Sequence, residues 1–133
     1  MLPRNVTSAA APDLCDSLYA MPQRPRLAAK VRPNRDRRRP YRFRIRGRVK
    51  LPSGVRKADG CRGEVRVRIK RKGRSRTVTR RRAKVRSSCR FSRRVRLGGQ
   101  RLGRRGTLRF TVRFRGNALL LPKTVRRQAR YGR

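Results

Sequence analysis

The feature that most constrains the fold is a strict alternation of apolar and basic residues over residues 41–50. Tyr41, Phe43 and Ile45 occupy odd positions, and every even position from Arg42 to Arg48 is arginine. Successive side chains of a β-strand point to opposite faces, so a strand would separate the apolar set from the cations. A helix would spread the same charge around its whole circumference. The segment therefore predicts a strand with one buried face and one cationic face.

Further segments repeat this pattern between turn-forming residues, at 61–70, 75–85, 89–97 and 108–114, with a short edge strand at 119–122. Gly73 supplies the positive φ for a hairpin turn at 71–74. The alternation changes phase between Val78 and Ala83, which predicts a β-bulge near 80–82. Short strands without helices between them predict an all-β fold, a small antiparallel β-sandwich of about six or seven strands.

Three regions are expected along the chain. Residues 1–40 contain six prolines and no sustained period, which predicts a largely disordered, basic Pro/Arg-rich leader. Residues 41–122 form the sandwich, and residues 123–133 form a basic C-terminal tail. No run of about 18 apolar residues is present, so no transmembrane segment is expected. The first 20 residues lack the continuous apolar stretch of a signal peptide, so the chain either stays inside the cell or starts downstream of its export signal.

The chain has three cysteines. Cys61 and Cys89 share the inward phase of their segments, and a disulfide between them would stabilise the fold by roughly 3–4 kcal/mol. Two buried free thiols are the alternative. Cys15 is expected to remain unpaired in the leader. No metal site is expected, because three cysteines without histidine or a Cys-x-x-Cys spacing do not supply a zinc ligand set.

No catalytic residue can be assigned. The chain lacks histidine, so Ser-His and Cys-His nucleophile pairs are excluded. The five carboxylates are scattered, and Glu64 is expected to be a surface ion-pair partner. The glycine-rich stretch 98–103 lacks the Gly-Lys-Ser/Thr ending of a phosphate-binding loop, which favours a hairpin loop. The sequence therefore predicts a protein that is not an enzyme and that has no cofactor and no small-molecule substrate.

Charge is the strongest functional signal. Lys and Arg total 44 against five acidic residues, for a net charge of +39. Codon usage in a GC-rich genome inflates arginine but does not explain the shortage of Asp and Glu. Alternate residues of a strand lie roughly 6.6 Å apart, closer than the ~8 Å screening length, so the arginines repel one another.

A bound polyanion would relieve this repulsion, and a solvated face with chloride counterions is the alternative. The residues expected to contact the polyanion are the outward-facing arginines that alternate with the inward apolar residues. They are Arg42, Arg44, Arg46, Arg48, Arg62, Arg66, Arg68, Arg109 and Arg113. Sequence-specific reading of nucleic acid is not expected, because no recognition helix, zinc finger or RNA-binding aromatic motif is present.

Several motifs carry a family resemblance. These are the alternating stretch from Tyr41, the Leu-Pro-Ser-Gly turn at 51–54, the Gly-Cys-Arg-Gly-Glu-Val stretch at 60–65, the Ser-Cys-Arg-Phe stretch at 88–91 and the stretch 108–117. Together they resemble immunoglobulin-like or fibronectin-like β-sandwich modules of secreted proteins from high-GC actinobacteria, over roughly residues 41–122. The resemblance implies an adhesive, spacer or wall-associated module with a cysteine pair at Cys61 and Cys89 and no catalytic residues.

The leading hypothesis is a non-catalytic, secreted or envelope-associated β-sandwich module that contacts anionic cell-wall polymers. The alternative is a cytoplasmic, sequence-independent nucleic-acid-binding protein, favoured by the charge. The oligomeric state stays open.

Overall fold

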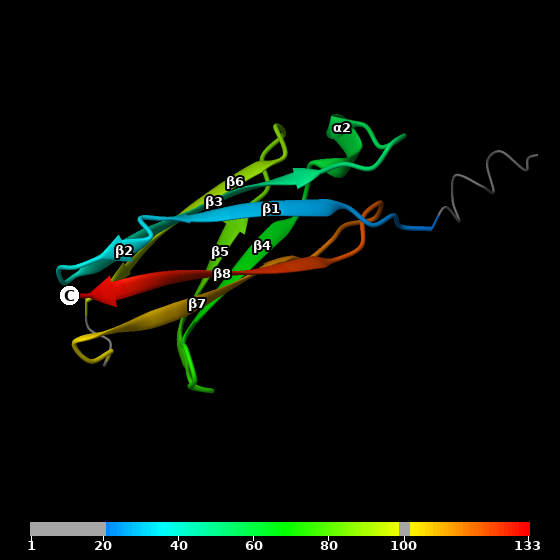
Figure 1. Ribbon diagram of the computed structural model, residues 1–133. Helices are drawn as coiled ribbons and strands as arrows, with labels where there is room; N and C mark the ends of the chain where they lie inside the picture. The colour runs from blue at the N-terminus through cyan, green and yellow to red at the C-terminus, as the bar shows by residue number, and fades with distance from the viewer. Residues whose placement is uncertain (1–20, 99–101) are drawn as a thin grey trace, which may run out of the picture.

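The computed structural model describes residues 21–98 and 102–133 and shows a β-sandwich of two sheets (Figure 1). One sheet has the order β1-β3-β6, with bounds β1 (Arg26–Arg32), β3 (Tyr41–Lys50) and β6 (Arg90–Leu97). The other has the order β2-β8-β7-β4-β5, with bounds β2 (Arg35–Asp36), β8 (Lys123–Gly132), β7 (Arg105–Phe114), β4 (Glu64–Arg71) and β5 (Thr77–Lys84). The expected all-β sandwich is confirmed, with eight strands in place of six or seven.

The core lies between the two sheets and is formed by the apolar positions of the alternating segments. Phe43 of β3 packs edge-on against Phe110 of β7, with ring centroids 5.6 Å apart. Tyr41 meets Tyr131 of β8 at 5.2 Å. Among the described residues, no polar or charged residue is fully buried. The inward and outward phases predicted for β3 and β7 are therefore confirmed.

Gly47 interrupts the apolar positions of β3 because a neighbouring ring fills its place. It pairs with Phe91 of β6, and a Cβ atom at Gly47 would lie 2.8 Å from Cε1 of Phe91. The aromatic ring covers the glycine backbone, as aromatic residues do opposite glycines in other sheets. The inward space at Gly47 is therefore filled by the Phe91 ring, although glycine itself has no side chain.

The predicted boundaries of the sandwich at residues 41 and 122 were wrong. Strand β1, inside the expected leader, pairs with β3 from Arg26↔Lys50 to Arg32↔Arg44 and buries Leu27 and Val31. Strand β8, inside the expected tail, pairs with β7 over its whole length and buries Tyr131. Both segments supply apolar side chains to the core, so they are structural strands. Residues 1–20 of the expected leader lie outside the described residues.

Three local predictions have different outcomes. The hairpin turn at 71–74 is confirmed, since Gly73 has φ 80° and the amide of Arg74 donates to the carbonyl of Arg71 at 3.0 Å. The bulge lies at Val78 rather than at 80–82, because Ile69 pairs with Thr79 and Lys70 pairs with Thr77.

The stretch 119–122 is not an edge strand. Leu120 makes only an isolated bridge to Gln23, and the stretch is held as a turn by the Asn117 side chain.

A single turn of helix, α2 (Lys57–Gly60), precedes β4 at the end of the sandwich opposite the C-terminus (Figure 1). The strand expected to start at residue 61 therefore starts at Glu64. Across residues 21–98 and 102–133, none of the helical structure is long or apolar enough to cross a membrane.

Candidate polyanion-binding faces

The outer surface of the three-stranded sheet, here called the three-strand face, is almost entirely cationic. It consists of the even-numbered residues of β1, β3 and β6, which point away from the core. Eleven of these thirteen residues are basic, namely Arg26, Lys30, Arg32, Arg42, Arg44, Arg46, Arg48, Lys50, Arg90, Arg94 and Arg96. The other two are Ala28 and Ser92, which are small and lie beneath a shallow depression of about 690 Å³. Long cationic side chains surround a low floor.

Strand pairing places like charges directly opposite one another on this face. Arg42 pairs with Arg96, and Arg44 pairs with Arg94. Opposed like charges in a sheet are destabilising. No carboxylate occupies any outward position of these three strands, all of which the structure describes. The repulsion must therefore be relieved by anions from solution or from a partner.

The outer surface of the five-stranded sheet is here called the five-strand face, and β4, β5, β7 and β8 form most of it. It carries arginine and threonine in cross-strand rows. One row contains Arg82, Arg66, Arg113 and Thr124, and the next contains Arg80, Arg68, Thr111 and Arg126. These two rows line a depression of about 930 Å³, which Arg81 and Arg93 also reach. Short threonines between long arginines leave room for an anion there.

Several guanidinium groups on the five-strand face already have partners within the protein. Glu64 accepts a hydrogen bond from Nε of Arg66 at 3.0 Å, and its carboxylate lies 3.9 Å from Arg82 and 3.8 Å from Arg115. The prediction that Glu64 is a surface ion-pair partner is confirmed. Arg68 donates from Nε to the hydroxyl of Thr77 at 2.7 Å. This face is therefore less free to bind external anions than its number of arginines indicates.

The expected contact residues divide between the two faces. Arg42, Arg44, Arg46 and Arg48 lie on the three-strand face, and Arg66, Arg68, Arg109 and Arg113 lie on the five-strand face. The two inner faces of a sandwich pack together, so these two outer faces point in opposite directions. The arginines named from the sequence therefore lie on two faces that point in opposite directions.

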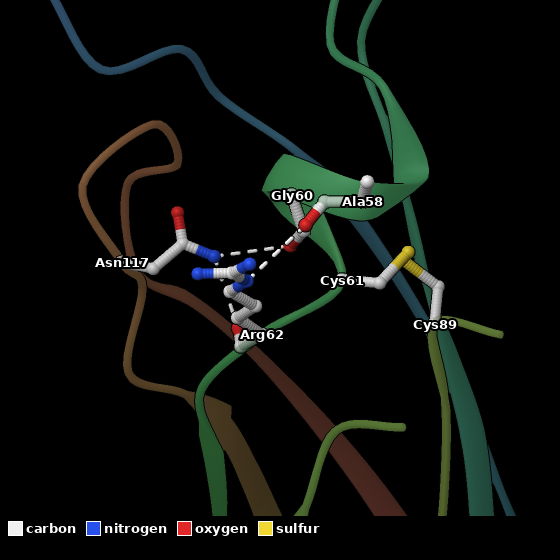
Figure 2. Close-up of a disulfide and its surroundings, with 6 residues drawn as sticks. All are labelled: Ala58, Gly60, Cys61, Arg62, Cys89 and Asn117. Atoms are coloured by element: carbon white, nitrogen blue, oxygen red, sulfur yellow. Dashed lines mark hydrogen bonds between the residues drawn. A yellow bond between two sulfur atoms is a disulfide. The ribbon is translucent and has the colours of Figure 1, made fainter. Parts of the chain in front are cut away.

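Arg62 lies on neither face. It is in the connection after α2, and its Nε donates to the carbonyl of Ala58 at 3.1 Å, which completes the hydrogen bonding at the end of that helical turn (Figure 2).

Three arginines break the alternation, and each lies at a lateral side of the sandwich. Arg81 of β5 and Arg93 of β6 occupy inward positions on neighbouring edge strands. Arg127 of β8 donates from Nε to the backbone carbonyl of Ala29 on β1 at 2.8 Å, which links the two sheets on the other side. Charges at inward positions of edge strands discourage pairing with a second chain. Arg81 and Arg93 therefore protect the two edge strands β5 and β6, whereas Arg127 connects the sheets.

A disulfide joins the two sheets at the end that carries α2. Cys61 follows α2 and Cys89 precedes β6, with their Cα atoms 4.5 Å apart (Figure 2). The expected pairing is present, and both residues are buried as the sequence suggested.

Asn117 ties the β7–β8 loop to the same end. Its amide nitrogen donates to the carbonyls of Gly60 at 3.0 Å and Arg62 at 2.9 Å (Figure 2). Its side-chain oxygen accepts from two amides of its own loop. The structure thus explains a residue that the sequence indicated only as a turn former.

The described carboxylates all hold structure. Asp36 accepts from the backbone amide of Arg42 at 2.7 Å and shapes the turn between β2 and β3. Asp59 pairs with Arg56 at 3.3 Å at the helical turn, and Glu64 is paired as above. Within residues 21–98 and 102–133, no group of three or more His, Cys, Asp or Glu side chains could hold a metal ion.

Sequence reasoning missed the basic residues of β1, β5, β6 and β8 on the two faces. The signal existed for β6, because an inward Phe91 and Val95 imply outward Arg90, Arg94 and Arg96. No such signal was clear for Arg80, Arg82 and Arg126, because inward arginines next to them obscure the phase of their strands.

Comparisons of the chain with protein-family models, with curated proteins and with solved structures found no match.

Proposed function

We propose that this chain is a non-catalytic module that acts outside the cytoplasm and holds anionic envelope polymers against its cationic faces. The observation that carries the proposal is the three-strand face, where eleven of thirteen outward residues are basic. Such a surface attracts polyanions and gains free energy by releasing their counterions. The function is structural or adhesive.

The strand order supports an immunoglobulin-like architecture. When the eight strands are lettered A, A′, B, C, C′, E, F and G in chain order, the sheets become A-B-E and A′-G-F-C-C′. The G-F-C-C′ arrangement is that of variable-type immunoglobulin sheets. Two features differ from antibody domains: the chain has no tryptophan, and the disulfide joins the segments before C and E instead of strands B and F. The similarity therefore concerns topology alone.

The disulfide supports a location outside the cytoplasm. Cys61 and Cys89 are buried and paired, and such structural disulfides persist in oxidising compartments. This favours an envelope polymer over nucleic acid as the partner, although both present repeated negative charges.

Binding is tested by titrating the full chain with fluorescent dextran sulfate at several salt concentrations, with uncharged dextran of equal length as the matched control. If about five cations of β3 contact the polymer, the logarithm of the affinity should fall with the logarithm of salt with a slope of about −3.5. Dextran should not bind. A slope shallower than about −1, or equal binding of dextran, contradicts the proposal.

Compartment is tested by mass spectrometry of the protein from its native host after fractionation. A Cys61–Cys89 bridge in the envelope or medium is the expected result. Both thiols free for alkylation in a cytoplasmic fraction would contradict the location and favour nucleic acid as the partner.

A further inference from the structure

We propose that the two faces bind two separate polyanion chains at once, so that one molecule cross-links them. The inference rests on the proposed function, because it needs each face to bind a polyanion. It goes further in assigning two sites of opposite direction to one domain.

The geometry keeps the two faces apart. The three-strand face is formed by even-numbered residues of β1, β3 and β6, and the five-strand face by the outward rows of β4, β5, β7 and β8. Packed sheets lie ~10 Å apart, and outward side chains add to this separation. That distance exceeds the ~8 Å screening length at physiological salt, so an anion on one face interacts weakly with the other.

Each face has the dimensions for one extended chain. From Arg42 to Lys50 the outward row of β3 spans roughly 27 Å, and the three strands together are about 10 Å wide between their axes. A linear polyanion lying along β3 would contact cations from β1 and β6 on either side. A second chain would find the arginine-lined depression on the five-strand face.

The sandwich transmits force between the two bound chains. The disulfide and the packing of Phe43 against Phe110 join one sheet to the other. Arg127 adds a hydrogen bond from β8 to β1. Two polymers held on opposite faces would therefore be connected through a core in which a disulfide joins the two sheets.

The test uses an octaglutamate probe labelled with either a donor or an acceptor fluorophore. Its extended length is at most ~29 Å, enough to cover one face but too short to continue around the sandwich to the other. Bridging should produce energy transfer that rises and then falls as protein is added, because excess protein places each probe on a different molecule. Fluorescence anisotropy measures binding in the same samples.

Three variants with equal net charge separate bridging from general attraction, and in each variant four arginines become threonine, which favours strands. None of the replaced side chains donates a hydrogen bond within the described residues. The first variant removes Arg42, Arg46, Arg48 and Arg94, the second removes Arg80, Arg109, Arg113 and Arg126, and the third removes Arg46, Arg48, Arg113 and Arg126.

We expect the wild-type protein to bind two probes and give the bell-shaped signal. The first two variants should bind one probe, and their energy transfer should be at least tenfold lower than that of the wild-type protein. The third should still bind two probes, each more weakly, and keep the signal.

Energy transfer that falls equally in all three variants, or a wild-type protein that binds one probe only, overturns the cross-linking proposal and leaves polyanion binding intact. Absence of any anisotropy change in the wild-type protein overturns the proposed function itself.

Discussion

The three-strand face and the five-strand face are both rich in arginine, but their guanidinium groups differ in what they already contact. On the three-strand face, Arg44 donates to Ser92 at 3.2 Å and Arg32 weakly to Asn34 at 3.5 Å, and its outward positions include no carboxylate. On the five-strand face, Glu64 lies within 4 Å of three arginines. A count of arginines would rank the faces as similar, whereas the internal contacts rank the three-strand face as the more available.

One carboxylate at the right position changes the character of a whole face. Glu64 is the first residue of β4, and it lies near Arg66 on the same strand, Arg82 on β5 and Arg115 just after β7. We therefore expect the three-strand face to bind a polyanion more tightly.

Removing the disulfide tests whether both faces belong to one stable body. Replacing Cys61 and Cys89 by alanine should lower the free energy of unfolding by about 3.5 kcal/mol, because the bridge closes a loop with a sequence separation of 28 residues. Urea denaturation followed by circular dichroism measures the loss.

The matched control is Cys15→Ala, which also removes a cysteine but leaves the bridge intact. It should unfold like the wild-type protein, and reductant should destabilise it as it does the wild type. Equal stability of the double variant and the wild type would show that the bridge contributes nothing.

The ranking itself is tested by the two single-face variants described above. The variant that loses four arginines of the three-strand face should bind dextran sulfate on the order of 100-fold more weakly at its tighter site at physiological salt. The slope of the logarithm of affinity against the logarithm of salt should become shallower by about 3. The five-strand variant should weaken this binding less than about tenfold. Similar losses from both variants would show that the two faces bind the polymer equally well.

Gly47→Val is expected to affect only the three-stranded sheet. The new side chain would collide with the backbone oxygen of Ala28 on β1 as well as with the ring of Phe91 on β6. Overpacking of this kind costs about 2 kcal/mol of folding free energy. Gly73→Val is a useful reference, because its substituent meets no atom within 4 Å and its cost comes from the positive φ alone. Thermal unfolding that ranks Gly73→Val as the more damaging would contradict the packing account of Gly47.

The central strands could be predicted from the sequence because their phase is unbroken. In β3, β4 and β7 nearly every inward residue is apolar and nearly every outward residue is polar, so period-two alternation identifies both the strand and its buried face. The same phase predicted the cysteine pair, although the structure places Cys61 directly after α2 and Cys89 directly before β6, outside the strands.

Strand β8 could not be predicted, because its inward positions are not uniformly apolar. Strand β8 presents Val125, Arg127, Ala129 and Tyr131 on its inward phase, and Arg127 makes the stretch look like a basic tail. Its partner is a backbone carbonyl on β1, which is about 100 residues away in the chain and invisible to a local pattern. The pairing of the sheets, and hence the division of the arginines between two faces, depends on such distant contacts.

The smallest expected effect tests the role of the single carboxylate on the five-strand face. Glu64→Gln keeps the shape of the side chain and frees Arg66, Arg82 and Arg115 from their shared partner. Measured in the variant whose three-strand face lacks four arginines, it should tighten dextran sulfate binding about fourfold, which is the gain from one additional contact. The cost in stability should stay below about 1 kcal/mol, because Glu64 is partly exposed.

Asp59→Asn provides the matched control, since it also removes one negative charge but lies on α2 beside Arg56, away from both faces. If the effect of Glu64 comes from its position, Asp59→Asn should raise the logarithm of the affinity by less than about half of the increase that Glu64→Gln causes. Equal tightening by both substitutions would mean that polyanions sense the net charge of the domain. The two faces would then differ in their internal contacts without differing in their affinity.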